Sequence, residues 1–200
     1  MKILAFVDLH SSLKALKEIK NKVKNVDLII CAGDISIFEQ KIEYLLEQLD
    51  KLNKPILIIP GNHETAEDIK AASLVFKNII DLHKKVHKKG DHLFLGYGEG
   101  GFSMVDKEFE KIAKKFEKEI KKQEHKNSKI ILITHGPPYK TKLDNLDGHS
   151  CGNKSVKNFI KKVKPDLAIS GHLHENSGKE DKIGKTRLIN PGPKGKIINI

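Results

Sequence analysis

Residues 56–64 read Ile-Leu-Ile-Ile-Pro-Gly-Asn-His-Glu, a short apolar run that ends in polar side chains. A run of this length, bounded by proline and glycine, is typical of a strand buried on both faces. In open α/β sheets, ligands bind just beyond the carboxyl ends of such strands. Asn62 and His63 have no obvious packing role there, so this stretch predicts a parallel sheet with chemistry at one edge.

Four further apolar runs have the same form and end at residues 7, 32, 133 and 169. Each is followed within five residues by side chains that bind divalent metals. These side chains are Asp8 and His10, Asp34, His135, and His172 and His174. His172 and His174 share one side of an extended segment, because side chains alternate with a period of two. One such group alone is weak evidence, but five at equivalent strand ends predict a metal site.

The predicted ligands, with Asn62, are nitrogen and oxygen donors without a thiolate. This donor set suits Mn²⁺, Fe²⁺, Zn²⁺, Co²⁺ or Ni²⁺ better than Ca²⁺ or an all-oxygen Mg²⁺ site. The seven residues exceed what one tetrahedral ion needs, so we expect two ions about 3.5–4 Å apart, a spacing that clamps a phosphoryl group. Asp34 belongs to the central run of the first strand–helix–strand unit and is the expected bridge.

Length and composition favour one domain that spans residues 1–200. The net charge of +11 comes almost entirely from lysine, since Arg187 is the only arginine. Arginine is the main reader of bases, so we interpret the charge as solvated helix surfaces rather than a nucleic-acid footprint. Lysine and glutamate on the surface with isoleucine in the core are typical of a protein from a hot environment.

The sequence shows no run of 18 apolar residues, so no membrane span or membrane partner is predicted. The N-terminus enters the first strand pattern directly, and cleavage there would remove Asp8 and His10, which argues against a signal peptide. Cys31 and Cys151 do not suggest a disulfide framework. A cytoplasmic protein is the consistent expectation, and the oligomeric state is left open.

Helical periodicity follows three of the apolar runs, at about residues 11–23, 38–52 and 65–76. This alternation predicts parallel strands joined by right-handed crossovers. Further along, a hairpin is expected over 86–95, a helix over 106–125, and a closing antiparallel hairpin from 186–189 and 196–200. The histidines outside the predicted site are expected at the surface, and they are His83, His87, His92 and His125.

Five motifs in this order resemble the signature blocks of the calcineurin-like metallophosphoesterase superfamily. They are Asp8-x-His10, Gly33-Asp34, Gly61-Asn62-His63-Glu64, His135-Gly136 and Gly171-His172-x-His174. Residues 134–139 and 190–192 are similar to small prokaryotic and archaeal stand-alone phosphoesterases related to the cyclic-nucleotide phosphodiesterase branch. The resemblance implies an α/β fold, a four-layer αββα sandwich of two mixed β-sheets flanked by helices, with a dimetal centre at one edge.

The resemblance also implies a role for each motif residue. One ion would be held by Asp8, His10, Asp34 and His174, and the other by Asp34, Asn62, His135 and His172. His63 would bind no metal and would act as the catalytic histidine, while Glu64 and Glu175 would orient histidines from outside the ligand set. The implied activity is hydrolysis of small phosphodiesters or phosphomonoesters, nucleotides included, by in-line attack of a metal-bridging hydroxide. Mn²⁺ is the first expected ion, with Fe, Zn, Ni and Co as alternatives.

Two alternatives stay open at this point. The lysine excess leaves room for a nuclease acting on DNA or RNA, and the fold also occurs as a metal-binding scaffold without catalysis. The presence of His63 with a complete ligand set argues against the scaffold. Residues 35–37, Ile-Ser-Ile, replace the second aspartate and the arginine of protein Ser/Thr phosphatases, which argues against protein substrates.

Two weaker signals concern the surroundings of the site. Gly96-x-Gly98-x-x-Gly101 matches a dinucleotide-binding fingerprint, but it follows a hairpin strand rather than the first strand of a βαβ unit. We therefore interpret it as a cluster of turns that borders the site. The loop over residues 137–152 is long and polar for a compact domain, and such loops tend to be functional. We expect it to contribute to substrate selection.

Overall fold

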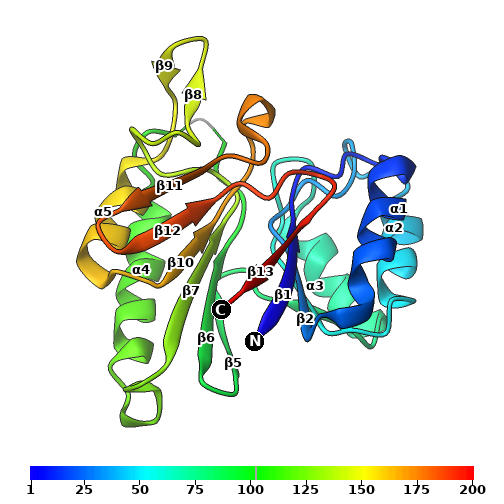
Figure 1. Ribbon diagram of the computed structural model, residues 1–200, viewed down its shortest axis with the longest axis horizontal. Helices are drawn as coiled ribbons and strands as arrows, with labels where there is room; N and C mark the ends of the chain where they lie inside the picture. Colours follow the sequence, from blue (N-terminus) through cyan, green and yellow to red (C-terminus); the bar gives the residue numbers. More distant parts are fainter. Residues whose placement is uncertain (102) are drawn as a thin grey trace.

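The computed structural model describes residues 1–101 and 103–200. The first sheet has five strands in the order β13 (Lys196–Asn199), β1 (Lys2–Phe6), β2 (Leu28–Cys31), β3 (Ile56–Ile58) and β4 (Ile79–Asp81). Strands β1 to β4 are parallel, and β13 pairs with β1 in the antiparallel direction. The sheet is therefore mixed, and the two chain termini lie near each other at its lower end (Figure 1).

The second sheet has six strands and is also mixed. Its order is β11 (Glu180–Ile183), β12 (Thr186–Ile189), β10 (Leu167–Ile169), β7 (Lys129–Thr134), β6 (His92–Tyr97) and β5 (Lys85–Lys89). The four central strands are parallel, and the edge strands β11 and β5 each form an antiparallel hairpin with their neighbour. A separate small hairpin joins β8 (Asn145–Leu146) to β9 (His149–Ser150).

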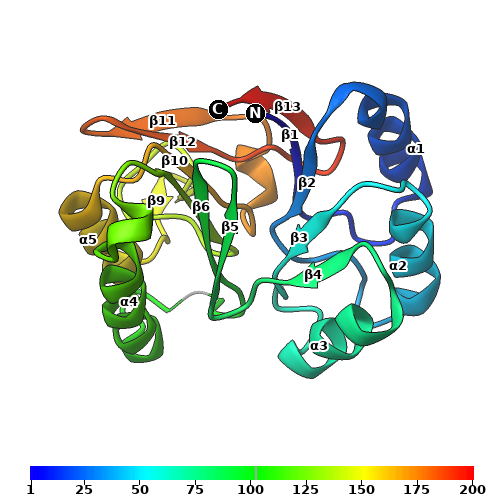
Figure 2. The same cartoon turned by 90° about the horizontal axis from the view of Figure 1, so that it is seen from below.

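Within residues 1–101 and 103–200, five α-helices cover the outer faces of the sheets. They are α1 (Leu13–Lys22), α2 (Ile42–Asp50), α3 (Ala66–Val75), α4 (Lys107–Ile120) and α5 (Lys154–Val163). Helices α1 to α3 cover the first sheet, and α4 and α5 cover the second (Figure 2). The described part of the chain also has short 3₁₀ turns at Val23–Asn25, Gln123–His125 and His174–Asn176. This arrangement confirms the predicted four-layer αββα sandwich.

Apolar side chains fill three layers. Ile30 and Leu57 face the second sheet, where they pack with Ile131 and Ile169 between the sheets. Alternate residues of the same strands face α1 to α3, and the second sheet packs against α4 and α5 in the same way. Both sheets are thus buried on both faces, which is why their strands appear in the sequence as continuous apolar runs. Among the described residues, no helix combines the length and apolar character needed to cross a membrane.

Helix starts are set by local capping. The Ser12 side chain accepts a hydrogen bond from the Ala15 N–H at 3.2 Å, and Thr65 forms a reciprocal capping box with Asp68. The predicted start of the second helix at residue 38 is wrong. Residues 38, 39 and 41 have positive φ, which a right-handed helix cannot contain, so α2 begins only at Ile42.

The predicted closing hairpin at the C-terminus is also wrong. Strand β12 pairs with β10 and β11 in the second sheet, whereas β13 pairs with β1 in the first. Residues 190–195 cross from one sheet to the other. Pro191 and Pro193 lie in this crossing, and proline has no N–H to give to a hairpin ladder. The C-terminal strand therefore ties the two sheets together.

Three of the four histidines expected at the surface are buried: His83, His92 and His125. The His83 ring stacks on Tyr97, and the His92 ring stacks on Phe94. The sequence interpretation was wrong here because it treated these histidines as polar surface residues. The flat imidazole ring is apolar enough to pack against aromatic neighbours in the second sheet.

Candidate metal centre

The predicted ligand residues follow the carboxyl ends of strands from both sheets. Asp8 lies two residues after β1, Asp34 three after β2 and Asn62 four after β3. In the second sheet, His135 follows β7 directly, and His172 lies three residues after β10. Because these strands are parallel neighbours within each sheet, their ends meet along the upper edge of the sandwich in Figure 1.

The backbone at this edge is strained. Asp8, His10, Asp34 and His172 all have positive φ, at 55°, 43°, 53° and 70°. For residues other than glycine such conformations cost about 1–3 kcal/mol each and persist only where the surroundings hold them. Here the Asp8 N–H donates to the Gly33 carbonyl at 3.1 Å, and the His10 N–H donates to the Asp34 carbonyl at 3.0 Å. The strain is therefore concentrated where the chain positions polar side chains.

A first group of side chains contains Asp8, His10, Asp34 and His174, with one potential ligand atom of each within 4.8 Å of the others. The Nε2 atoms of His10 and His174 are 2.9 Å apart. The Asp8 Oδ1 atom lies 4.0 Å from His174 Nε2, and the Asp8 carboxylate also accepts the backbone N–H of His172 at 3.1 Å. Burial raises the pKa of Asp8 and lowers the pKa of His10, so each charged form needs a partner of opposite charge.

A second group contains Asp34, His135 and His172. The Asn62 Oδ1 atom joins it, at 3.0 Å from His135 Nε2 and 2.8 Å from His172 Nδ1. His135 is fully buried, whereas the His172 ring is partly exposed. Burial and the nearby charge of His135 lower the pKa of His172 to about 4, which leaves the His172 ring neutral and able to bind a metal at neutral pH.

Asp34 belongs to both groups. Its Oδ2 atom lies 3.3 Å from His135 Nε2 and 3.7 Å from His10 Nε2. Its Oδ1 atom accepts the backbone N–H groups of Asn62 at 2.8 Å and His63 at 3.1 Å. Burial alone would raise the pKa of Asp34, but the hydrogen bond and charge of His135, with the His63 N–H, hold it at about 2. The carboxylate is therefore ionised and faces both groups.

In the second group, hydrogen-bond acceptor atoms face each other, and this arrangement fits a bound cation. The Nδ1 atom of His135 lies 2.9 Å from the Ala32 carbonyl. A carbonyl can only accept, so this ring nitrogen carries the proton. In the neutral ring, Nε2 then points its lone pair at the oxygens of Asp34 and Asn62. A cation removes the repulsion between these lone pairs. Although burial lowers the pKa of His135, the neighbouring Asp34 carboxylate raises it overall, because a proton on Nε2 would also relieve this repulsion. A bound cation would take the place of that proton.

His63 lies beside the first group without belonging to either. Its ring is 4.9 Å from the His10 ring, centroid to centroid, in an edge-on arrangement. Its Nδ1 atom accepts the backbone N–H of Phe38 at 3.2 Å. The neutral ring therefore carries its proton on Nε2, which is free to donate.

A sequence model of the calcineurin-like phosphoesterase family matches residues 1–176. This chain belongs to the calcineurin-like phosphoesterases. It is accordingly a phosphoric ester hydrolase from a family that binds divalent metal ions. The family match covers all the strand ends described above, and the two clusters at this edge have the nitrogen and oxygen donors that such ions prefer.

Two relatives extend the comparison. An uncharacterized protein of Methanocaldococcus jannaschii is 32% identical over 99% of this chain and 91% of its own length. A probable glycerophosphodiester phosphodiesterase of Arcobacter nitrofigilis is 29% identical over 86% of this chain, and the match spans 65% of that relative. The chain thus matches nearly the whole of one relative and just under two thirds of the other.

Solved structures share the fold. The crystal structure of TT1561 from Thermus thermophilus superposes with a TM-score of 0.73 at 18% identity, covering 99% of this chain and 98% of that one. A dimetal phosphatase from Danio rerio gives a TM-score of 0.69 at 11% identity, covering 94% of this chain and 86% of the other. At these identities the likeness concerns the architecture alone.

Glu64 contacts backbone groups and Ser36, and the expected roles of Glu64 and Glu175 in orienting histidines stay predictions. Glu64 Oε2 accepts the N–H groups of Asp34 at 3.0 Å and Gly61 at 3.2 Å, and Oε1 accepts both the N–H and the hydroxyl of Ser36. Glu64 therefore fastens the loop after β2 to the loop after β3. Glu175 is exposed and makes no hydrogen bond or ion pair with the described residues.

Replacing Glu64 with glutamine is expected to destabilise the fold. The new amide nitrogen would face the backbone N–H groups of Asp34 and Gly61, so buried donors would lose their acceptor. We expect the free energy of unfolding to fall by about 2–3 kcal/mol, measured by urea denaturation. Glu67→Gln is the matched control, because Glu67 is exposed on α3, and it should change stability by less than about 0.5 kcal/mol. Equal stability of the two variants would contradict this role of Glu64.

The loops are packed too closely at the site to admit larger residues. A β-carbon on Gly61 would lie 2.0 Å from Asp34 Oδ1, so this position requires glycine. The predicted glycine-turn cluster also borders the site, since a β-carbon on Gly136, next to His135, would meet the Gly100 carbonyl at 3.3 Å. Gly96 itself is a strand residue of β6, so the interpretation of the whole cluster as turns is wrong for that residue.

Residues 137–152 form an ordered loop. The buried carboxylate of Asp144 accepts the N–H groups of Lys140, Thr141 and Gly152. The Asn176 amide, two residues beyond His174, donates to the carbonyls of residues 143 and 145. The loop is thus fastened to the segment that carries a predicted ligand. Its expected part in substrate selection stays a prediction.

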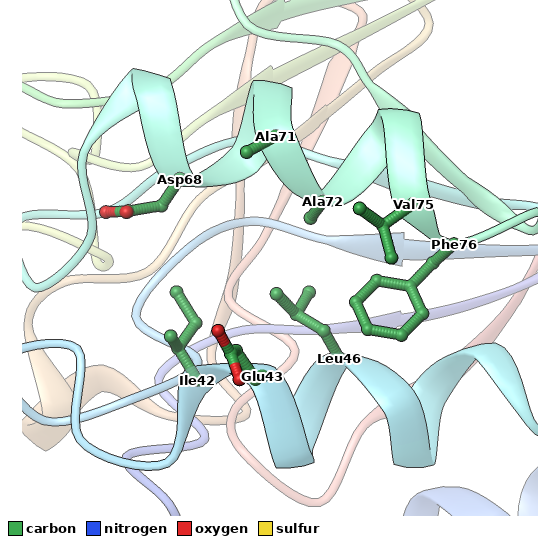
Figure 3. A pocket seen from close by; sticks show the side chains of 8 residues that line it. All are labelled: Ile42, Glu43, Leu46, Asp68, Ala71, Ala72, Val75 and Phe76. Atoms are coloured by element: carbon green, nitrogen blue, oxygen red, sulfur yellow. The ribbon is translucent and has the colours of Figure 1, made fainter.

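An apolar hollow of about 350 Å³ lies between α2 and α3 and is lined by side chains such as Leu46, Ala72 and Phe76 (Figure 3). None of the predicted ligand residues lines it.

Sequence reasoning missed two residues near the site: Ser36, which contacts Glu64, and Phe38, which contacts His63. Neither belongs to a recognisable motif, and each contact depends on how one loop folds against the next.

Proposed function

We propose that this chain hydrolyses small phosphodiesters or phosphomonoesters, with nucleotides among the candidates, in a site that holds two divalent ions. The observation that carries the proposal is the position of Asp34, whose carboxylate belongs to both ligand groups. Asp8, His10 and His174 would complete the site of one ion, and Asn62, His135 and His172 that of the other. Manganese is the first candidate for both positions.

Each part of the site has a distinct task in this proposal. Two divalent ions supply Lewis acidity toward phosphoryl oxygens and lower the pKa of water. The ionised Asp34 carboxylate and the surrounding rings fix the site before substrate arrives, because backbone hydrogen bonds already hold them. His63, with its proton on Nε2, would stabilise a phosphoryl oxygen or protonate the leaving oxygen.

A diester substrate has additional support from the comparisons. The Arcobacter nitrofigilis relative is described as a probable glycerophosphodiester phosphodiesterase. A phosphodiester has one negative charge, so its hydrolysis depends strongly on activation of water and on protonation of the leaving oxygen. His63 beside the first ligand group supplies a donor for that second requirement.

Hydrolysis by metal-stripped protein that is refilled with one ion at a time tests this proposal. Bis-p-nitrophenyl phosphate and p-nitrophenyl phosphate report diester and monoester cleavage through the same chromophore. We expect turnover to return with Mn²⁺, and to be higher for the diester. Binding of two ions without turnover of either ester would contradict the proposal and favour a metal-binding scaffold.

One observation favours a nuclease as a second candidate. The ammonium groups of Lys140, Lys154 and Lys157 lie 5.7, 4.9 and 5.9 Å from the centre of the Tyr139 ring, four residues after His135. Lysines around an aromatic ring are a common platform for single-stranded nucleic acid. Cleavage of an oligonucleotide that weakens steeply as salt rises would support this candidate. Cleavage of small esters alone would exclude it.

A further inference from the structure

Phe38 is a large apolar side chain that stays exposed at the candidate site. The residue is 73% exposed, yet its ring contacts His63 edge-on with 4.5 Å between ring centroids. The His63 ring in turn contacts His10, which belongs to the first ligand group. Phe38 is therefore one ring away from a predicted metal ligand, with most of its surface open to solvent.

The backbone that presents Phe38 has an unusual conformation for its sequence. Residues 37–40 form a turn closed by a hydrogen bond from the Gln40 N–H to the Ile37 carbonyl at 3.0 Å. Both central residues, Phe38 and Glu39, have positive φ, at 45° and 63°. Turns of this kind normally contain asparagine and glycine, because other residues are strained there. A bulky aromatic residue at such a position requires support from its surroundings.

The site itself provides that support. The Phe38 N–H donates to His63 Nδ1 at 3.2 Å, and the Glu39 N–H donates to the His63 carbonyl at 3.2 Å. The Ser11 hydroxyl, next to His10, donates to the Gln40 carbonyl at 3.3 Å. The turn is thus fastened to both neighbouring loops, and the position of the Phe38 ring is fixed relative to the ligand groups. Strained residues held in this way are typical of ligand clamps.

We propose that the Phe38 ring is the platform on which an aromatic group of the substrate, such as a nucleobase, packs while its phosphate occupies the metal centre. The inference rests on the proposed function and narrows it to phosphate esters that carry an aromatic group. A ring that stacks on Phe38 covers apolar surface that is otherwise wet, and aromatic pairs gain further from edge and face contacts. An ester with only a small polar group would leave Phe38 exposed.

Adenosine 5′-monophosphate and ribose 5-phosphate provide the test, because they differ only in the base. Their inhibition constants are measured from initial rates of bis-p-nitrophenyl phosphate hydrolysis by the Mn²⁺-loaded protein. For the wild type we expect adenosine 5′-monophosphate to bind at least about fivefold more tightly. Phe38→Ala should remove that preference, and Phe38→Tyr should restore it. Leu74→Ala on α3, where Leu74 is 81% exposed, is the control and should retain it.

Saturation-transfer NMR on the Zn²⁺-loaded protein gives a readout that needs no turnover. We expect transfer to the adenine protons in the wild type and a clear loss in Phe38→Ala. An unchanged preference in Phe38→Ala would overturn the inference, as would an equal loss of affinity for both inhibitors, which would limit Phe38 to supporting His63. If no metal restores hydrolysis, the proposed function fails by itself, while the NMR comparison still decides whether Phe38 contacts the base.

Discussion

Asp34→Asn is expected to leave the protein with at most one bound ion and to lower kcat by about 10³-fold or more. The carboxylate belongs to both ligand groups, and Oδ2 is the atom that faces both. If the amide oxygen keeps accepting the N–H groups of Asn62 and His63, the amide nitrogen takes the place of Oδ2. Losing the two-ion centre removes several kcal/mol of transition-state stabilisation, which corresponds to this loss of rate. Metal content is measured by inductively coupled plasma mass spectrometry after gel filtration, and kcat with bis-p-nitrophenyl phosphate.

Asp91→Asn is the matched control for this prediction, because Asp91 is exposed in the turn between β5 and β6. It should retain two ions and full activity. The fold of Asp34→Asn should persist, since the amide oxygen can still accept the N–H groups of Asn62 and His63. Two retained ions with kcat within tenfold of the wild type would show that Asp34 is not the shared ligand.

His63→Ala is expected to keep both ions and to lower kcat by about 10²- to 10⁴-fold, the range for loss of a positioned proton donor. The His63 ring contacts His10 but belongs to neither ligand group. Parallel measurements of kcat and metal content therefore separate His63 from the ligands, whose loss should affect both.

His87→Ala serves as the control, because His87 lies on the edge strand β5 and belongs to neither ligand group. This control should change neither kcat nor the metal content. Loss of one ion from His63→Ala would make His63 a metal ligand, and unchanged kcat would remove it from the reaction.

The strand ends were predictable from the sequence because burial on both faces leaves a continuous apolar run, so the first polar residue marks the edge of the sheet. Asp8, Asp34, Asn62 and His135 were all placed in this way, and the structure brings them together. Their roles as ligands stay predictions. The implied bridging position of Asp34 agrees with its membership of both groups.

Features that depend on contacts between distant segments were not predictable. The pairing of β13 with β1 joins the two ends of the chain. The prolines of the preceding connection argue against a C-terminal hairpin, but they do not indicate which strand is the partner. Glu64 has backbone partners from two different loops, and its motif alone does not indicate these partners. The turn that carries Phe38 lacks the asparagine and glycine that would have identified it in the sequence.

The most direct test of the shared-ligand site is anomalous diffraction from crystals of the Mn²⁺-loaded protein. We expect two anomalous peaks about 3.5–4 Å apart, one beside Asp8, His10 and His174 and the other beside Asn62, His135 and His172. The Asp34 carboxylate should contact both peaks. A single peak, or two peaks of which only one contacts Asp34, would contradict the account.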